Sequence, residues 1–266
     1  MCQQDRAGVK EYLMELYSSK NILKALVVKY FVGRYKNSLI GAGWHFIVPL
    51  ISLAVYYVVF SQIRTGNMES FWVYVAVGIF PFHYMVNNLT GGSGAIVGNS
   101  SMVKKMYFPR EILVFAQSIS TFIVMFIGLM VILLVTLFSR SVVSWSIVLL
   151  PLILLILFIF VTGMVFLLSS ITVYIRDVQY FLSSVSMVFF FITPMYFETE
   201  SLHGILNLIV WLNPFTYFVE LFHVVLYDGV FPQLSLLVSA CIISAIVLLV
   251  GVYVFNKLKS GFVERL

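Results

Sequence analysis

The sequence predicts an all-α, polytopic membrane protein. We expect six transmembrane helices, an N-terminal amphipathic interfacial helix, and a re-entrant outer helical hairpin between spans five and six. Hydrophobic residues make up 61% of the 266 residues and charged residues only 10%, whereas an ordinary soluble domain is about 25% charged. A soluble fold could not cover so much apolar surface with polar residues. Aromatic residues are 17% of the chain, which excludes a disordered protein.

The N-terminal part, residues 9–35, is predicted to form an amphipathic helix on the cytoplasmic surface of the membrane. Apolar residues recur at helical spacing from Val9 to Val27, and Lys20 and Lys29 lie in the second half. An apolar stripe beside basic residues is typical of helices that lie on an anionic leaflet.

The spans are predicted from charge-free, mostly apolar runs, because a helix needs about 20 such residues to cross the hydrocarbon core. In chain order, the predicted spans are residues 41–63, 70–90, 112–139, 147–175, 178–197 and 232–256. We find no soluble domain, so residues 1–266 are expected to form a single transmembrane domain.

Residues 199–227 could form either a seventh span or a re-entrant hairpin, since Gly204 and Pro214 interrupt the uncharged stretch Ser201–Val219. The basic residues decide between the two. With six spans and a cytoplasmic N-terminus, 14 of the 16 Lys and Arg residues lie inside, as the positive-inside rule requires. A seventh span would move Lys257 and Lys259 outside. We therefore predict the hairpin, with both termini cytoplasmic.

The hairpin region is acidic. The stretch from Glu198 to Pro232 contains four acidic residues and no Lys or Arg. Glu220 and His223 lie one helical turn apart, and residues at this spacing face each other on a helix. We expect them to form a local pair.

Motifs for catalysis, metal binding or nucleotide binding are absent from the sequence. The Gly91–Ser100 stretch, GGSGAIVGNS, resembles a phosphate loop, but Asn99 stands where that loop needs Lys. We expect no catalytic residue, no metal ligand and no cofactor on this chain. The predicted span cores contain no Asp, Glu, Lys or Arg, which argues against a proton-coupled transporter. For His83, in span two, a structural hydrogen bond is favoured over a proton relay.

A short basic and aromatic segment, residues 100–111, joins spans two and three on the cytoplasmic side. Its charges could merely set the topology, or the segment could couple the chain to a cytoplasmic partner through aromatic anchors and basic contacts. The residues alone leave both interpretations open. The candidate coupling residues are Lys104, Lys105, Tyr107, Phe108, Pro109 and Arg110.

A series of short motifs runs in order along residues 20–266. They are RYKNSLIG at Arg34–Gly41, Trp44, Pro49, GIFPF at Gly78–Phe82, VKKMYFPR at Val103–Arg110, YIRD at Tyr174–Asp177, Thr193-Pro194, Asn213-Pro214 and FNKLK at Phe255–Lys259. This ordered set resembles the membrane (permease) subunit of bacterial type-2 ABC exporters for cell-surface polysaccharide, above all the O-antigen and lipopolysaccharide export group. Phe82 and Tyr84 depart from the pattern, since relatives often carry Trp there, and this leaves the sugar specificity open.

The resemblance implies a homodimer with twelve spans in the bacterial inner membrane, joined to two copies of a separate ATPase subunit that binds ATP and Mg²⁺. It implies export of an undecaprenyl-pyrophosphate-linked polysaccharide through a channel at the dimer interface. It also implies that the Lys104–Arg110 segment and the N-terminal amphipathic helix contact the ATPase.

A glycan channel would favour aromatic rings, which can face the C–H surfaces of sugars. An aromatic belt facing lipid is the alternative interpretation of each such ring. The candidate channel residues are Tyr56, Tyr57, Phe80, Phe82, Tyr84 and Tyr196. Arg34 and Lys36 could contact the lipid pyrophosphate, although positive-inside anchoring explains them equally well.

Three other functions remain open from the residues. The chain could belong to a type-2 exporter of teichoic acid, capsule or a small molecule. A membrane-embedded transferase would need acids or His clustered at one membrane face, and the sequence shows no such cluster. The third of these alternatives is a purely structural scaffold. Nucleic acid is not an expected partner, because the net charge of +5 is explained by topology.

Overall fold

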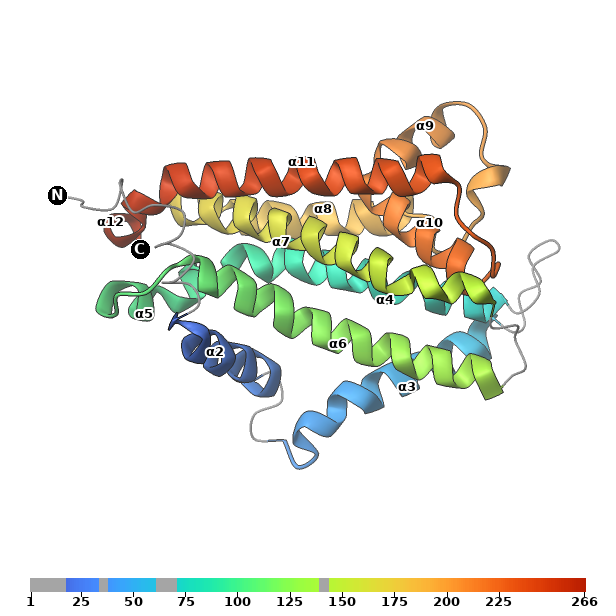
Figure 1. Cartoon of the computed structure of the whole chain (residues 1–266), viewed down its shortest axis with the longest axis horizontal. Helices are drawn as coiled ribbons and strands as arrows, with labels where there is room; N and C mark the ends of the chain where they lie inside the picture. The colour runs from blue at the N-terminus through green and yellow to red at the C-terminus, as the bar shows by residue number, and fades with distance from the viewer. Residues whose placement is uncertain (1–17, 34–37, 61–70, 139–143) are drawn as a thin grey trace.

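The computed structural model describes residues 18–33, 38–60, 71–138 and 144–266. Over these residues the chain is helical and contains no strand, which confirms the all-α prediction. The long helices run side by side along the long axis of one bundle (Figure 1). The C-terminus and α5 lie at one end of the bundle, called the α5 end below, and α9 lies at the other, called the α9 end.

The helices lie close to the ranges that hydropathy predicts. The α-helices are α2 (Lys20–Gly33), α3 (Trp44–Phe60), α4 (Phe71–Thr90), α5 (Ser100–Lys105), α6 (Glu111–Phe138), α7 (Leu150–Tyr174), α8 (Val178–Ile192), α9 (Ile205–Leu212), α10 (Pro214–Leu226), α11 (Leu234–Leu258) and α12 (Phe262–Arg265). Single 3₁₀ turns are η1 (Gly41–Gly43), η2 (Gly92–Gly94), η3 (Val97–Asn99), η4 (Trp145–Leu149), η5 (Thr199–Ser201) and η6 (Lys259–Gly261).

Length and composition support fewer than six spans. Among the described residues, three helical stretches are long and apolar enough to cross a membrane: Glu111–Leu134, Trp145–Tyr174 and Leu234–Arg265. The bent pair α9–α10 makes a fourth if it counts as one span, and α3 and α8 are shorter apolar helices. The α4 helix is long enough but carries the polar residues His83, Asn87 and Asn88. Six spans therefore stay a prediction.

Proline sets two of the helix ends. The predicted fifth span runs to residue 197, but α8 ends at Ile192, because proline at 194 disfavours helical backbone in the residue before it. Pro214 occupies the first turn of α10, and the Asn213 side chain accepts a hydrogen bond of 3.0 Å from the Phe215 amide. This cap starts a new helix, and α9 and α10 meet at 90°.

The closest helix pair in the bundle is α7 against α11. A Cβ atom on Gly163 of α7 would lie 2.6 Å from the Cα of Leu248 on α11, and Gly251 of α11 lies directly against the Gly163 carbonyl. Small residues let two backbones approach in this way, and membrane helices pack largely through such close contact.

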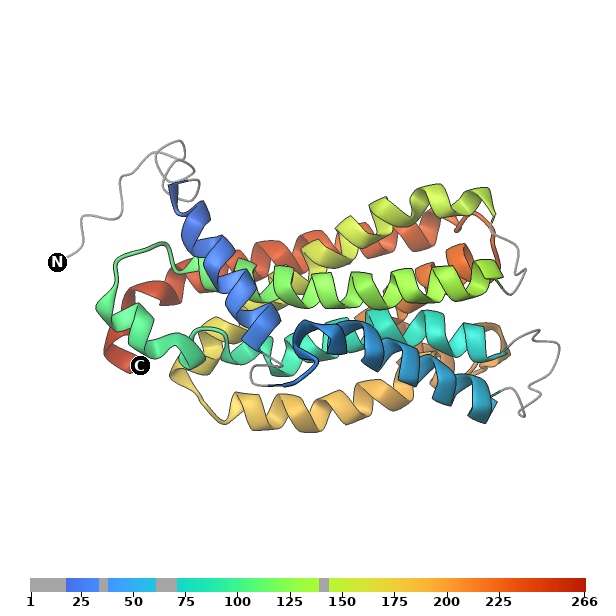
Figure 2. The ribbon, with the colours of Figure 1, turned by 90° about the horizontal axis from the view of Figure 1, so that it is seen from below.

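The α2 helix packs against the bundle. Its apolar stripe, centred on the buried Leu26, faces α6, and α2 crosses α6 obliquely (Figure 2). The sequence predicts that this helix lies on the cytoplasmic surface of the membrane, and that placement stays a prediction; for residues 20–33 the structure shows that α6 covers the side carrying Leu26. Val28 and Val32 remain exposed on the other side. Residues 9–17 of the predicted helix lie outside the described residues.

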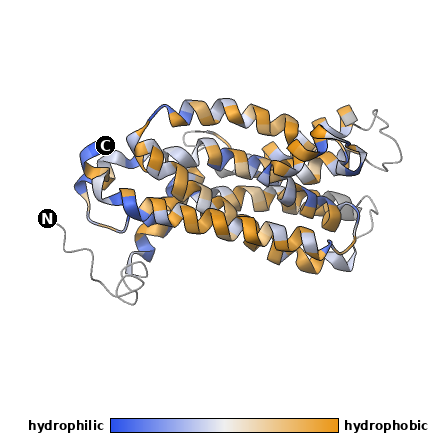
Figure 3. Ribbon diagram, turned by 90° about the horizontal axis from the view of Figure 1, so that it is seen from above, coloured by the Kyte–Doolittle hydropathy of each residue, from blue (hydrophilic) through white to orange (hydrophobic). Residues whose placement is uncertain are grey.

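Hydropathy divides the molecule along its length. Hydrophobic residues cover the long helices, and hydrophilic residues gather at the end where the C-terminus lies (Figure 3). This pattern is typical of a bundle whose middle is surrounded by lipid.

Candidate functional site: a polar face on α4 and a basic surface at the α5 end

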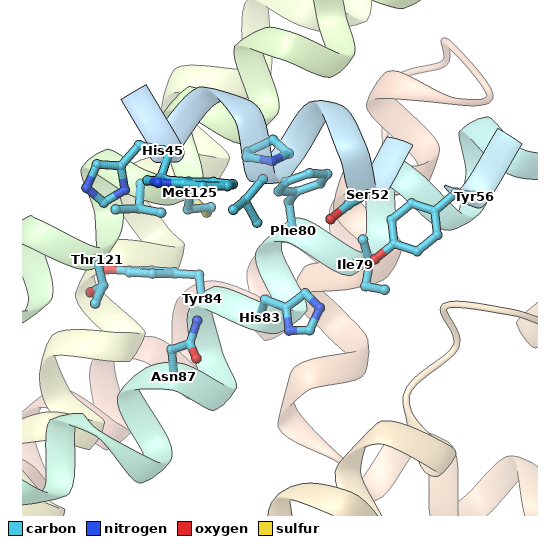
Figure 4. Close-up of a pocket in the computed structure, with 14 residues that line it drawn as sticks. His45, Ser52, Tyr56, Ile79, Phe80, His83, Tyr84, Asn87, Thr121 and Met125 are labelled. Atoms are coloured by element: carbon cyan, nitrogen blue, oxygen red, sulfur yellow. The ribbon is translucent and has the colours of Figure 1, made fainter. Parts of the chain in front are cut away.

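A pocket of about 240 Å³ lies between α3, α4 and α6 (Figure 4). Polar groups from all three helices line it, including Ser52 of α3, His83 and Asn87 of α4, and Thr121 of α6. Polar side chains are costly inside a membrane and occur mainly where they face protein or water. The pocket is therefore a candidate site and not ordinary lipid-facing surface.

The α4 side of the pocket presents one aromatic and two polar side chains. Phe80, His83 and Asn87 follow each other at spacings of three and four residues, so they lie on one side of the helix. His83 and Asn87 are exposed although most of α4 is buried. We call these three residues the α4 face. The expected hydrogen bond from His83 to a neighbouring helix does not form among the described residues.

The α3 and α8 helices flank α4 on two sides (Figure 2). Ser183 and Ser184 of α8 are exposed, and the Ser183 hydroxyl donates to the Tyr180 carbonyl of its own helix at 2.8 Å. Both flanking helices also expose large apolar side chains, such as Val55 of α3 and Val188 of α8. The polar α4 face thus lies between two apolar rims.

The walls of the pocket are held by buried polar contacts. Asn88 of α4 donates to the Thr121 hydroxyl of α6 at 2.9 Å and to the Tyr84 carbonyl at 2.8 Å. His45 of α3 is buried, donates to the Phe31 carbonyl of α2 at 2.9 Å and stacks on the Phe31 ring. The Asn88 bond thus fixes α4 against α6, and the His45 contacts tie α3 to α2.

Three of the six candidate channel aromatics meet in this pocket, namely Tyr56, Phe80 and Tyr84. Tyr84 is only 2% exposed, so its ring forms the pocket wall. Helical spacing could have identified His83 and Asn87, since both follow Phe80 on one side of an uncharged span.

The other three candidate aromatics lie elsewhere. Phe82 is 2% exposed and packs against Phe190 and Phe215, with ring centroids 5.9 and 6.3 Å away. Tyr57 meets Trp72 edge to face, and Tyr196 packs against Phe190. The structure therefore does not bring these three to the α4 pocket.

At the α5 end, the candidate coupling segment consists of α5 and the extended residues after it. Lys104, Lys105 and Tyr107 are exposed, Tyr107 to 80%, and so is Met106. Phe108, by contrast, is 7% exposed and belongs to the core of the chain. The surface that a partner could contact is therefore formed by the exposed residues Lys104, Lys105, Met106 and Tyr107.

Arg110 and the adjacent Glu111 face inward to the C-terminal segment. Arg110 donates to the Lys259 carbonyl and lies 5.8 Å from the centroid of the buried Phe262 ring. Glu111 forms an ion pair of 3.2 Å with the Lys259 ammonium. We call these contacts the C-terminal clasp, since they tie the end of the coupling segment to η6 and α12.

A second set of contacts ties the start of the coupling segment to α2. Asn99 accepts a 3.0 Å bond from the Lys29 ammonium and donates a 2.6 Å bond to the Tyr30 hydroxyl. The coupling segment is therefore bonded to α2 at its start and to the C-terminal segment at its end, so a movement of α5 would act on both. Arg34 and Lys36, the candidate pyrophosphate contacts, lie outside the described residues.

At the α9 end, the expected local pair of Glu220 and His223 is wrong. The Glu220 carboxylate accepts a 3.1 Å bond from the Thr199 hydroxyl. His223 is 1% exposed, donates to the Tyr74 carbonyl at 3.0 Å and stacks on the Tyr74 ring. Tertiary partners on η5 and α4 thus replace the helical neighbour.

Comparison with known proteins gives a consistent result. The family model described as ABC-2 type transporter matches residues 21–227. The chain is 24% identical over 254 residues to the O-antigen export system permease protein RfbA of Myxococcus xanthus, covering 95% of this chain and 98% of the relative. It is 25% identical over 240 residues to a protein of the same name from Klebsiella pneumoniae, covering 88% and 90%. This chain belongs to the ABC-2 transporter membrane family, whose members are transport subunits.

Proposed function

We propose that this chain is the permease subunit of an ATP-driven exporter of an undecaprenyl-pyrophosphate-linked polysaccharide of O-antigen type. The exporter would work in the bacterial inner membrane through a channel between two copies of the chain. The observation that carries the proposal is the polar and aromatic α4 face between the apolar rims of α3 and α8. The names of the relatives, which match nearly end to end, support the substrate class.

The α4 face supports a channel between two copies. If α3 and α8 of one copy pack against those of a second copy, their exposed apolar side chains are covered. The two α4 faces then border a shared space filled with water, where His83 and Asn87 keep their hydration. Phe80 and Tyr56 would offer rings to the sugar C–H surfaces without strong directional bonds.

The proposed topology has six spans: α3, α4, α6, α7, α8 and α11. The α9–α10 pair is a re-entrant hairpin, and both termini are cytoplasmic. The α3 and α8 helices have 17 and 15 residues, fewer than the usual 20 or so. A bilayer can thin locally around short spans at modest cost. The α5 end then faces the cytoplasm and the α9 end faces outward.

The energy for transport would come from a partner. Two copies of a separate ATPase subunit bind ATP and Mg²⁺ in this proposal, because the sequence contains no P-loop. The ATPase docks on Lys104, Lys105, Met106 and Tyr107, and the contacts of Asn99 with α2 extend that surface to the N-terminal helix. Arg34 and Lys36 would contact the lipid pyrophosphate.

Deletion of the gene tests the proposal. We expect surface polysaccharide to disappear and lipid-linked polysaccharide to accumulate in the cytoplasmic leaflet, as measured on glycan-stained gels of surface and membrane fractions. Expression of the chain with its ATPase restores export, whereas expression with an ATPase that lacks its P-loop lysine does not. Unchanged surface polysaccharide after deletion would contradict the proposed function.

A further inference from the structure

A second and larger pocket is lined by residues of η5, α9, α10, the segment after α10 and the first turns of α11; the bent α9–α10 pair lies at the α9 end of the bundle (Figure 1). The pocket has a volume of about 590 Å³, which falls in the range of small-molecule sites, about 300–1,000 Å³. It shares no lining residue with the α4 pocket. We call it the outer pocket.

Carboxylates supply much of the polar lining of the outer pocket. Glu200, Glu220 and Asp228 come from η5, α10 and the segment after α10. No Lys or Arg occurs between residues 198 and 232 to neutralise them. Burial, followed by the charges of Glu198 and Glu200, raises the pKa of Asp228. These carboxylates disfavour an anionic ligand and favour a ligand rich in hydrogen-bond donors.

Glu220 has free acceptor capacity in this pocket. One carboxylate oxygen accepts the Thr199 bond, while the other, Oε2, is buried and has no hydrogen-bond partner among the described residues. A buried carboxylate oxygen without a donor is costly. A hydroxyl group of a bound ligand would supply that donor.

Aromatic rings also line the outer pocket. Trp211 of α9 and Tyr217 of α10 meet edge to face with ring centroids 5.3 Å apart, and both line the pocket. Phe231, before α11, also lines it and is 65% exposed. Rings of this kind can lie against the C–H faces of sugars, while carboxylates accept the hydroxyl protons.

We propose that the outer pocket binds uncharged sugar residues of the exported glycan after they leave the channel. Sugar hydroxyls donate to Glu220, Glu200 and Asp228, and the ring faces pack on Trp211 and Tyr217. The inference rests on the proposed function and adds to it a glycan site apart from the α4 face. It also assigns a substrate preference, since uronic acids and other acidic sugars would be repelled here.

Photo-crosslinking in cells tests what occupies the pocket. The photoreactive residue p-benzoylphenylalanine replaces Phe231 in the full chain, expressed with its ATPase in cells that make the surface glycan. The matched control carries it in place of Trp145, which is 84% exposed on η4 and does not line the pocket. After illumination, we expect the chain with the probe at position 231 to carry a glycan-stained ladder about tenfold stronger than the control.

A second pair of variants tests the carboxylate. In the Phe231 probe background, Glu220→Gln keeps an oxygen that can accept the bond from Thr199 but replaces the unpartnered Oε2 acceptor with an amide donor, so the ladder should weaken about fivefold. Glu198→Gln, on an acid that does not line the pocket, should leave the ladder unchanged.

The outcomes distinguish a failure of this inference from a failure of the proposed function on which it rests. If the unmodified chain exports no glycan, both the proposed function and the outer glycan site are overturned. Normal export without a ladder above the control, or with adducts of phospholipid or protein alone, would overturn the outer glycan site and leave the exporter intact. Equal ladders for Glu220→Gln and Glu198→Gln would overturn the role of the carboxylate.

Discussion

At the scale of single residues, the charges of the coupling segment divide into two groups with different roles. Lys104 and Lys105 are exposed and free to meet a partner. Arg110 and Glu111 are committed to the C-terminal segment through the Lys259 carbonyl and ammonium. Charge alone therefore does not identify a docking residue, because burial decides which charges a partner can reach.

The C-terminal clasp leads to a stability prediction for Lys259→Met. The change leaves the Glu111 carboxylate, which is 7% exposed, without its ion-pair partner. Because Lys259 itself is 32% exposed, solvent screening limits the loss in unfolding free energy to about 1–2 kcal/mol. Thermal unfolding in detergent should show a lower melting temperature. Lys257→Met, at an exposed site two residues earlier at the end of α11, is the control, and equal melting temperatures of the two variants would contradict the clasp.

At the scale of elements, two features matter most: the close packing of α7 against α11 and the placement of the short α5 helix, which belongs to the proposed docking surface. The α7 and α11 helices meet through Gly163 and Gly251, whose missing side chains let the backbones touch. The α5 helix is only six residues long. It is held by the buried Val103 and by the contacts of Asn99 at one end and Arg110 at the other.

The α7–α11 contact predicts that Gly163→Ala is destabilising. The new methyl group would lie 2.6 Å from the Leu248 Cα, so the helices must move apart, at a cost of about 1–3 kcal/mol in unfolding free energy. Gly98→Ala is the matched control, because a Cβ there meets nothing within 4 Å. Thermal unfolding of both variants measures the difference, and an unaffected Gly163→Ala protein would refute the close contact.

If the ATPase docks on α5 as proposed, Lys104→Glu combined with Lys105→Glu should uncouple transport. Both side chains are exposed, so membrane insertion and folding should remain intact. Reversed charges at a complementary interface repel the partner, and we expect export and ATPase co-purification to fall at least about tenfold. Arg176→Glu, exposed at the same end, should have little effect. Full export by the double variant would rule out this surface as the coupling site.

At the scale of the whole molecule, the proposed exporter is incomplete as one chain. The α4 face lies open between α3 and α8, and both rims present exposed apolar residues. A second copy would cover the rims and enclose the face. The outer pocket, by contrast, is built within one chain from η5, α9, α10 and α11.

Crosslinking of two copies tests this assembly. In a background with Cys2→Ser and Cys241→Ser, we place Val55→Cys on α3 and Val188→Cys on α8, two exposed positions. A thiol-specific bifunctional reagent applied to membranes should yield covalent dimers on a denaturing gel. Leu249→Cys, also exposed but on α11, should stay monomeric, and the reverse pattern would place the interface elsewhere.

Much of the fold could be predicted from local patterns. Composition and charge-free runs determined an all-α membrane protein, and the helix positions followed because apolar length and proline act locally. The missing P-loop and the ordered motifs indicated a transport subunit of an ABC exporter. The exposed Lys104 and Lys105 were found for the same reason, since hydrophilic residues between two spans stay in water.

Tertiary structure decided which side chains meet. It buried Phe108 and Phe82, covered the α2 stripe with α6, and gave Glu220 and His223 partners on η5 and α4 in place of each other. It also joined three acids and three aromatic residues, from separate segments, into the outer pocket. Helical periodicity specifies which residues share a face, but the neighbour of that face depends on contacts between distant segments, which no local pattern contains.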